Sequence, residues 1–249
     1  MPRRLRVSPR EGGAHMRWVE DRLRELADKD GGYRAFNARI VATADPATML
    51  GVRVPRLRRL AREVGRSEDR DAFLAELPHR WYEEYLVHAF VLDETREVGR
   101  AVRLLDALLP LVDNWCVCDA LDPRAFHDEK ALGGRRQEVL LPLARRWMAS
   151  ERTYTRRFGV STLMRNLLGK GFDPSQLRLA IAADNGEYYV RMMVAWYLAE
   201  ALVTREDDAL EAIGSPGIDP QLQRMAIRKG IESRRVPADT KDALRRLRR

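Results

Sequence analysis

The chain has 249 residues, with 45 Lys and Arg against 37 Asp and Glu, so its formal net charge is +8. Hydrophobic residues make up 45% and charged residues 33%, and no run approaches the ~18 apolar residues of a membrane helix, which excludes a membrane-spanning protein. Two cysteines cannot frame a disulfide scaffold, which favours a reducing, cytoplasmic location.

The first fifteen residues are basic, contain Pro and Gly, and include no apolar stretch. A secretory signal needs ~7–15 consecutive apolar residues, so this segment does not fit one. We expect residues 1–15 to be a disordered basic tail, or to be absent if translation starts at Met16. Because no composition shift marks a boundary further along, we expect residues 16–249 to form a single domain.

The spacing of apolar residues predicts helices almost throughout, since i, i+3 and i+4 stripes recur and strand-like alternation is missing. The first helix is expected near 16–28, and Tyr33, Phe36, Ile40 and Val41 form the apolar stripe of a second. A third, over 54–64, has Pro55 suited to its first turn and Gly65 to its end. Further helices are predicted at 82–92, 98–109, 139–147, 154–168, 177–183, 188–203, 222–231 and 240–247.

This pattern predicts an all-α protein of roughly a dozen helices joined by short connections. Antiparallel helix pairs of ~40 residues each are typical of a HEAT-like α-solenoid with an ARM-type fold. No crisp sequence repeat is visible, so a compact irregular bundle remains the alternative.

Several familiar chemistries have no motif in the sequence. No phosphate-binding glycine loop occurs, so no nucleotide cofactor is expected. Cys116 and Cys118 lie two apart and would point away from each other on a helix. No metal site is expected either, because the histidines never pair at ligand spacing: His15, His79, His88 and His127.

Three segments combine aromatic, acidic and basic residues: 112–119, 154–160 and 187–196. In the first, Trp115 and Asp119 are four residues apart and would share one helix face. Taken singly, these side chains fit ordinary roles, namely a core Trp, a capping Asp and solvated arginines. The pI near 9.8 favours a polyanionic partner, nucleic acid being the commonest, although an arginine-rich composition alone gives the same value.

In these segments the chain resembles the AlkD-like DNA alkylation repair family, the HEAT-like repeat DNA glycosylases. The resemblance runs from about Trp18 to Arg249. It is carried by the order of five loosely specific stretches: 49–58, 114–119, 156–160, 188–196 and 229–236.

The resemblance implies a right-handed superhelix of helix pairs whose concave basic surface holds duplex DNA. It implies hydrolysis, without a cofactor, of the N-glycosidic bond of cationic purines such as N3-methyladenine and N7-methylguanine. By motif, Asp119 matches the catalytic carboxylate, and Trp115 and Trp196 match the two cleft tryptophans. Arg157 matches the cleft arginine that grips a phosphate, with Arg156 as the alternative if the register differs by one.

Phosphate contacts are expected from the basic residues of the matching stretches. With several such contacts, the affinity for DNA should fall steeply as the salt concentration rises. We expect the protein to be a monomer that associates with the nucleoid when it is bound to DNA. The expected DNA-contact residues are Arg53, Arg56, Arg59, Arg156, Arg191, Lys229, Arg234 and Arg235.

Two other functions stay open. Cys116 comes directly after Trp115, and Ala199 and Glu200 lie on the stretch that follows Trp196. These residues differ from those of the family's active members. The second hypothesis is therefore a divergent branch of the family that binds DNA without excising bases. A protein-binding solenoid is the third hypothesis, since concave helical surfaces often hold peptides.

Overall fold

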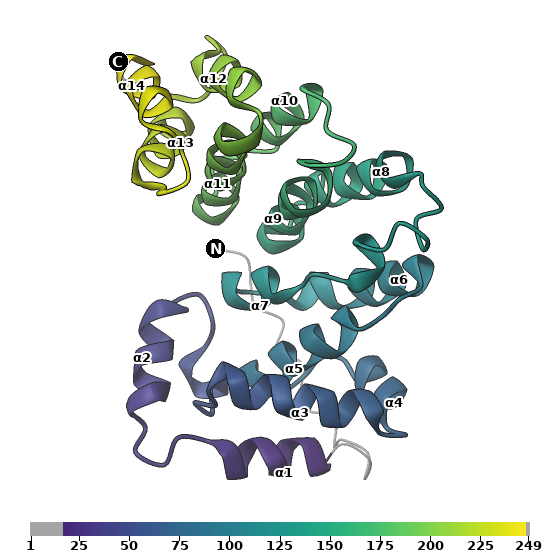
Figure 1. Cartoon of the computed structure of the whole chain (residues 1–249). Helices are drawn as coiled ribbons and strands as arrows, with labels where there is room; N and C mark the ends of the chain where they lie inside the picture. Colours follow the sequence, from purple (N-terminus) through teal and green to yellow (C-terminus); the bar gives the residue numbers. More distant parts are fainter. Residues whose placement is uncertain (1–16, 248–249) are drawn as a thin grey trace. The chain divides into compact units, whose positions relative to one another are not determined.

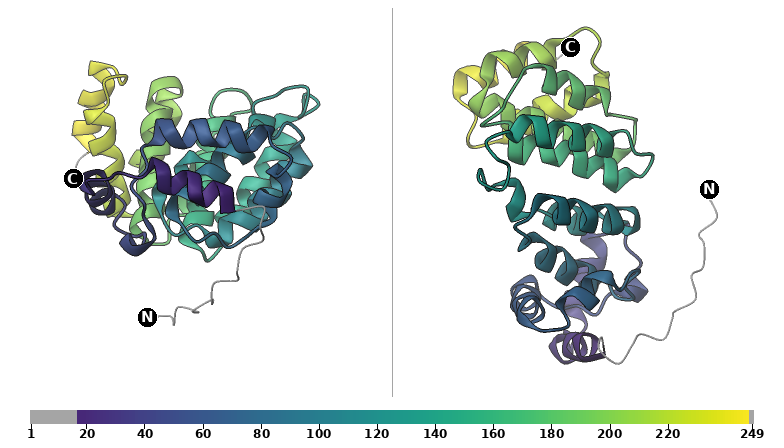
Figure 2. Two further views of the ribbon diagram at one scale, coloured as in Figure 1. Left: turned by 90° about the horizontal axis from the view of Figure 1, so that it is seen from below. Right: turned by 90° about the vertical axis from the view of Figure 1, so that its right-hand side faces the viewer.

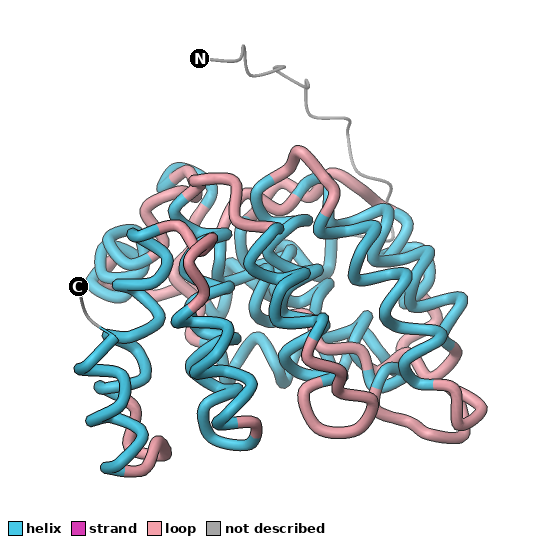
Figure 3. The backbone as a smooth tube through the Cα atoms, turned by 90° about the horizontal axis from the view of Figure 1, so that it is seen from above, coloured by secondary structure: helices cyan, strands magenta, loops and turns pink. Residues whose placement is uncertain are grey.

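The structure, a computed structural model, describes residues 17–247, and all regular elements in that range are helical (Figures 1 and 3). The predicted all-α class is therefore confirmed for these residues. The predicted tail at 1–15 lies outside them. No helix within 17–247 is both long and apolar enough to cross a membrane.

The chain divides into two compact units. Unit 1 contains the described residues 17–95 and 103–121, and unit 2 contains 96–102 and 122–247. Helix α6 (Val98–Leu108) contributes to both. This division does not test the single-domain prediction, which stays a prediction.

Unit 1 is built around helix α5, which is apolar on nearly every side and buries residues from Tyr82 to Leu92. Helix α5 packs against α1, α3, α4 and α7. Leu57, Leu60 and Val64 of α3 complete this core, while the arginines of α3 remain outside it. The helices of unit 1 are α1 (Arg17–Leu26), α2 (Gly32–Ile40), α3 (Val54–Arg66), α4 (Arg70–Ala75), α5 (Tyr82–Asp93) and α7 (Trp115–Ala120), with 3-10 turns at Pro46–Thr48 and Leu109–Leu111.

Unit 2 has two rows of helices. Helices α9, α11 and α13 pack side by side in one row, and in the other row α12 contacts both α10 and α14 (Figures 1 and 2). The central helix α11 is buried along most of its length, with Tyr197 fully enclosed. The helices of unit 2 are α8 (Arg136–Met148), α9 (Thr153–Thr162), α10 (Ser175–Ala182), α11 (Tyr188–Thr204), α12 (Glu206–Gly214), α13 (Pro220–Glu232) and α14 (Ala238–Leu247), with a 3-10 turn at Arg124–Phe126 and a π turn at Leu163–Leu167.

Two parts of the helix prediction need correction. Of the apolar stripe on the second predicted helix, only Val41, which follows α2, is buried, whereas Phe36 and Ile40 of α2 are exposed. The single helix predicted over 154–168 is α9 followed by the π turn. Helices α4, α7 and α12 are additional to the predicted set.

Gly159 allows the close approach of α8 and α9. A Cβ at this position would lie 2.6 Å from the backbone N of Met148 and 2.8 Å from the carbonyl O of Ala144. Backbone atoms cannot move aside cheaply, so Gly159→Ala is expected to destabilise the fold by roughly 1–3 kcal/mol in urea unfolding. Gly65→Ala in α3 is the control: its Cβ meets nothing within 4 Å, and it should be neutral or stabilising. Equal effects of the two substitutions would contradict this account.

Glu84 accepts backbone N–H bonds from Arg80 and Trp81, at 2.9 and 2.8 Å, at the start of α5. Burial raises the pKa of Glu84 to about 7, although these N–H bonds lower it. Between the unfolded pKa of about 4.3 and the folded one, the folded state binds more protons, so the contribution of Glu84 to stability is lost as pH rises towards 7.

Glu84→Gln keeps an oxygen for the two N–H groups but does not titrate. Wild-type stability should therefore fall relative to Glu84→Gln, by roughly 3 kcal/mol in total between pH 4 and pH 8. Urea unfolding of both proteins across this pH range measures the difference between their free energies of unfolding. The other titrating groups are the same in both proteins, so their contributions cancel in this difference. A difference that does not change with pH would show that Glu84 titrates normally.

Candidate functional site

Helix α7 places two of the predicted site residues one turn apart. Its N-cap is Asn114, whose side-chain oxygen accepts the backbone N–H of Val117 at 2.9 Å, as a capping Asn should. Trp115 is the first residue of the helix and Asp119 the fifth, and both are half-exposed. The indole N–H of Trp115 donates to the carbonyl of Ile40, the last residue of α2, at 3.3 Å.

Cys116, the residue after Trp115, links α7 to Tyr82 of α5. The hydroxyl of Tyr82 hydrogen-bonds to the thiol of Cys116. Burial raises the pKa of Cys116, the Tyr82 bond lowers it, and the charge of Asp119 raises it again. The net direction is upward, so the carboxylate of Asp119 lies beside a neutral thiol.

Arg53, the N-cap residue of α3, approaches a second tyrosine, Tyr33 of α2. Its guanidinium carbon lies 4.6 Å from the ring centroid of Tyr33, and Tyr33 in turn interacts electrostatically with Cys116. Both tyrosines therefore interact with Cys116, which also interacts with Asp119. We call Tyr33, Arg53, Tyr82, Trp115, Cys116 and Asp119 the α7 cluster.

The solvent side of α3 carries five arginines, namely Arg56, Arg58, Arg59, Arg62 and Arg66. Arg56 and Arg59, both predicted DNA contacts, are exposed. Arg56 donates to the carbonyl of Leu26 at 3.1 Å, whereas Arg59, Arg62 and Arg66 make no ion pair within the described residues. The exposed guanidinium groups are free to contact an anionic partner.

Helix α11 presents a half-exposed stripe formed by Tyr189, Met192, Trp196 and Glu200. The indole N–H of Trp196 donates to Glu200 at 3.4 Å, and Glu200 forms a 2.6 Å ion pair with Arg235. Arg235 thus balances a carboxylate next to the tryptophan, a pairing that sequence reasoning did not predict.

The two adjacent arginines of α9 are largely occupied inside unit 2. Arg157 is 5% exposed, and its Nη1 donates to the carbonyl of Tyr189 at 2.6 Å. Arg156 is half-buried and donates to the carbonyl of Ser150 at 2.8 Å. Both side chains tie α9 to neighbouring backbone.

The remaining predicted contacts differ in availability. Arg191 is 9% exposed and forms a 2.8 Å ion pair with Asp184 and a 3.5 Å one with Asp219. Lys229 is half-exposed and Arg234 exposed, and neither forms an ion pair between residues 17 and 247. Lys229 and Arg234 are therefore better placed than Arg191 to meet a phosphate.

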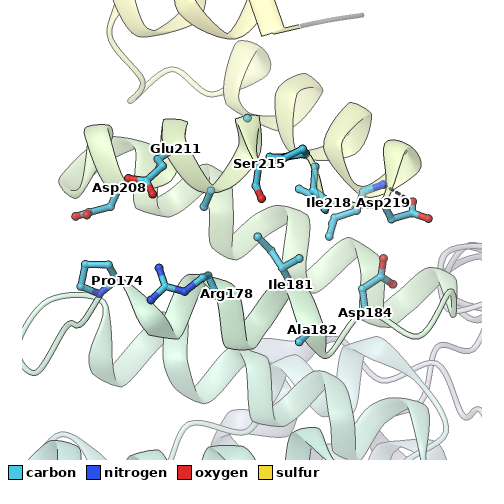
Figure 4. Close-up of a pocket in the computed structure, with 15 residues that line it drawn as sticks. Pro174, Arg178, Ile181, Ala182, Asp184, Asp208, Glu211, Ser215, Ile218 and Asp219 are labelled. Atoms are coloured by element: carbon cyan, nitrogen blue, oxygen red, sulfur yellow. Dashed lines mark hydrogen bonds between the residues drawn. The ribbon is translucent and has the colours of Figure 1, made fainter.

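A pocket of about 740 Å³ lies in unit 2 between α10, α12 and the loop before α13 (Figure 4). Asp208 and Glu211 of α12 face Arg178 of α10 across it, over an apolar floor that includes Ile181. None of the predicted site residues lines this pocket. Its carboxylates make it unsuited to a polyanion.

Trp115 and Asp119 belong to unit 1, and Arg157 and Trp196 belong to unit 2. Their assembly into one site stays a prediction. Tyr33, Tyr82 and the backbone partner of Arg157 are additions from the structure. The i, i+3 and i+7 spacing of Tyr33, Phe36 and Ile40 was visible in the sequence, but it does not indicate the contact of Tyr33 with Arg53.

A search of curated proteins found no match. The family model of the DNA alkylation repair enzymes matches residues 19–233, which is most of the chain. That range includes the α7 cluster, the α3 arginines and helix α11. The chain therefore belongs to the DNA alkylation repair enzyme family, which assigns it a role in DNA repair.

Proposed function

We propose that this protein is a DNA glycosylase that hydrolyses the N-glycosidic bond of cationic alkylated purines in duplex DNA. The observation that carries the proposal is the placement of Trp115 and Asp119 on α7, half-exposed and one turn apart. Family membership supplies the DNA substrate. The proposed catalytic residues are Asp119, Trp115, Trp196 and Arg157, acting without a metal or nucleotide cofactor.

The chemistry follows from the charge of the substrate. Alkylation makes the base cationic, so the C1′–N bond breaks with its electron pair going to the base, which leaves neutral. The sugar becomes an oxocarbenium-like cation, which the carboxylate of Asp119 would stabilise. Water then adds to C1′, and Asp119 accepts its proton. The indole faces of Trp115 and Trp196 would favour the cation by roughly 0.5–2 kcal/mol each.

We propose that phosphate contacts hold the duplex on a right-handed HEAT-like solenoid, formed by a single domain acting as a monomer. The exposed positions of Arg53, Arg56, Arg59 and Arg234 support this assignment, and half-exposed Lys229 fits it. Arg156, Arg191 and Arg235 would need to exchange their internal partners to join the contact set. A cytoplasmic, nucleoid-associated location stays a prediction.

A second candidate is a DNA-binding protein of a divergent branch that does not excise bases. The engagement of Arg157 with the Tyr189 carbonyl favours it, because a buried arginine is not positioned to grip a phosphate. Salt-sensitive binding of undamaged duplex is expected of both functions, so only excision separates them.

The deciding experiment incubates excess purified full-length protein with a duplex containing N7-methylguanine and follows release of the free base. The proposed enzyme should release the base faster than spontaneous depurination and leave an abasic site. Tight duplex binding with release at the spontaneous rate would instead assign the non-catalytic function.

A further inference from the structure

Helix α2 presents an outward face that the fold leaves uncovered. Phe36 is 47% exposed and Ile40 is 44% exposed, although both are large apolar residues. They are four residues apart and therefore lie on the same side of the helix. Arg39 projects beside them and is exposed as well.

The charge on this helix is positive. Its nine residues include Arg34 and Arg39 and no Asp or Glu. Arg34 donates to the carbonyl of Pro46 at 3.1 Å, whereas Arg39 makes no ion pair among residues 17–247. An apolar pair flanked by an unpaired cation is complementary to the apolar groove walls and anionic backbone of a duplex.

The outward face of α2 adjoins the α7 cluster, because the ring of Phe36 stacks against that of Tyr33 with their centroids 6.2 Å apart. The carbonyl of Ile40 accepts the indole N–H of Trp115, so α2 ends at the proposed catalytic helix. The ring of Tyr33, on the same helix, lies under the guanidinium of Arg53. A duplex that brings its sugar–phosphate strand to Trp115 and Asp119 would therefore extend over this face.

We propose that α2 is a DNA-contact element, in which Phe36 and Ile40 enter the minor groove and partly unstack a base step while Arg39 contacts a phosphate. Phe and Ile are among the residues that proteins insert between bases in this way. The inference rests on the DNA binding of the proposed function, but it does not require base excision. Opening the stack next to a lesion would ease the approach of its sugar to the α7 cluster.

The test uses undamaged duplex DNA with 2-aminopurine, whose fluorescence rises when it is unstacked, at successive positions of an A·T tract. Full-length wild-type protein should increase the fluorescence, and Phe36→Ala/Ile40→Ala should leave it at the level of free duplex. The double variant should also bind about tenfold more weakly. Arg39→Gln should reduce the slope of log affinity against log salt by about one.

Leu111→Ala is the matched control, since it removes another exposed apolar side chain of unit 1, 37% exposed, outside α2. It should match wild type in both assays. An unchanged fluorescence response in the double variant would overturn the inference. The inference would also be overturned if wild type were a dimer, the double variant were a monomer, and both bound DNA equally well. That result would assign the face to a second copy of the chain. A protein that excises no base but shows the predicted response would refute only the glycosylase proposal.

Discussion

Replacement of Asp119 by Asn is expected to slow N7-methylguanine release from duplex DNA by about 10²- to 10³-fold in single turnover. The substitution keeps the shape of the side chain but removes the negative charge that would stabilise the sugar cation and accept the proton of water. Asp119 is half-exposed on α7, so little change in stability is expected. Affinity for undamaged duplex should stay within about twofold, because binding depends on phosphate contacts.

Asp113→Asn is the matched control. Asp113 lies just before α7, is exposed, and accepts a hydrogen bond from the amide of Asn114 at 3.0 Å. Asp113→Asn removes the same charge as Asp119→Asn, and the new Asn side chain can still accept the hydrogen bond from Asn114. The rate of N7-methylguanine release should therefore remain near that of wild type. If Asp119→Asn were as fast as Asp113→Asn, Asp119 would have no part in the chemistry, and the non-catalytic function would gain support.

The helical fold could be predicted because its signals are local. Apolar residues at helical spacing located α11 to within one residue, at 188–203 against Tyr188–Thr204. Helix α3 began at Val54 as predicted, but continued through Gly65 to Arg66. Gly65 meets nothing within 4 Å and does not have a positive φ, so it does not stop the helix.

The partners of charged side chains could not be predicted, because they are distant in the chain. The burial of Arg157 depends on the carbonyl of Tyr189, a backbone atom that has no sequence signature. Arg191 looked like a basic residue on an aromatic helix, yet Asp184 and Asp219 pair with it from two different loops. The exposure of Phe36 and Ile40 could not be predicted for a similar reason, since spacing shows which residues share a face but not whether another element covers it.

Glu83 is the buried carboxylate whose loss should damage unit 1 most. It is fully buried on α5 and accepts backbone N–H bonds from Leu50, Gly51 and Val52, with the shortest, to Gly51, at 2.7 Å. Gly51 has φ +86°, so the loop needs both a glycine and an acceptor that reaches all three donors. The next residue is Arg53, and Glu83 thereby fixes the position from which Arg53 reaches Tyr33.

Glu83→Ala would leave these donors without an acceptor inside the protein, at about 1–3 kcal/mol for each, so a total loss of roughly 4 kcal/mol is expected in urea unfolding. Glu83→Gln retains one oxygen but not the charge, and should cost less than half as much stability.

Glu97→Ala is the control. The exposed carboxylate of Glu97 also accepts two backbone N–H bonds, from Gly99 and Arg100, but water can replace it, so a loss of stability of about 1 kcal/mol is expected. Because the loop carries Arg53, the folded Glu83→Gln protein should also bind duplex DNA more weakly than Glu97→Ala. Equal stability losses for the two alanine variants would mean that the loop before α3 holds its shape without Glu83.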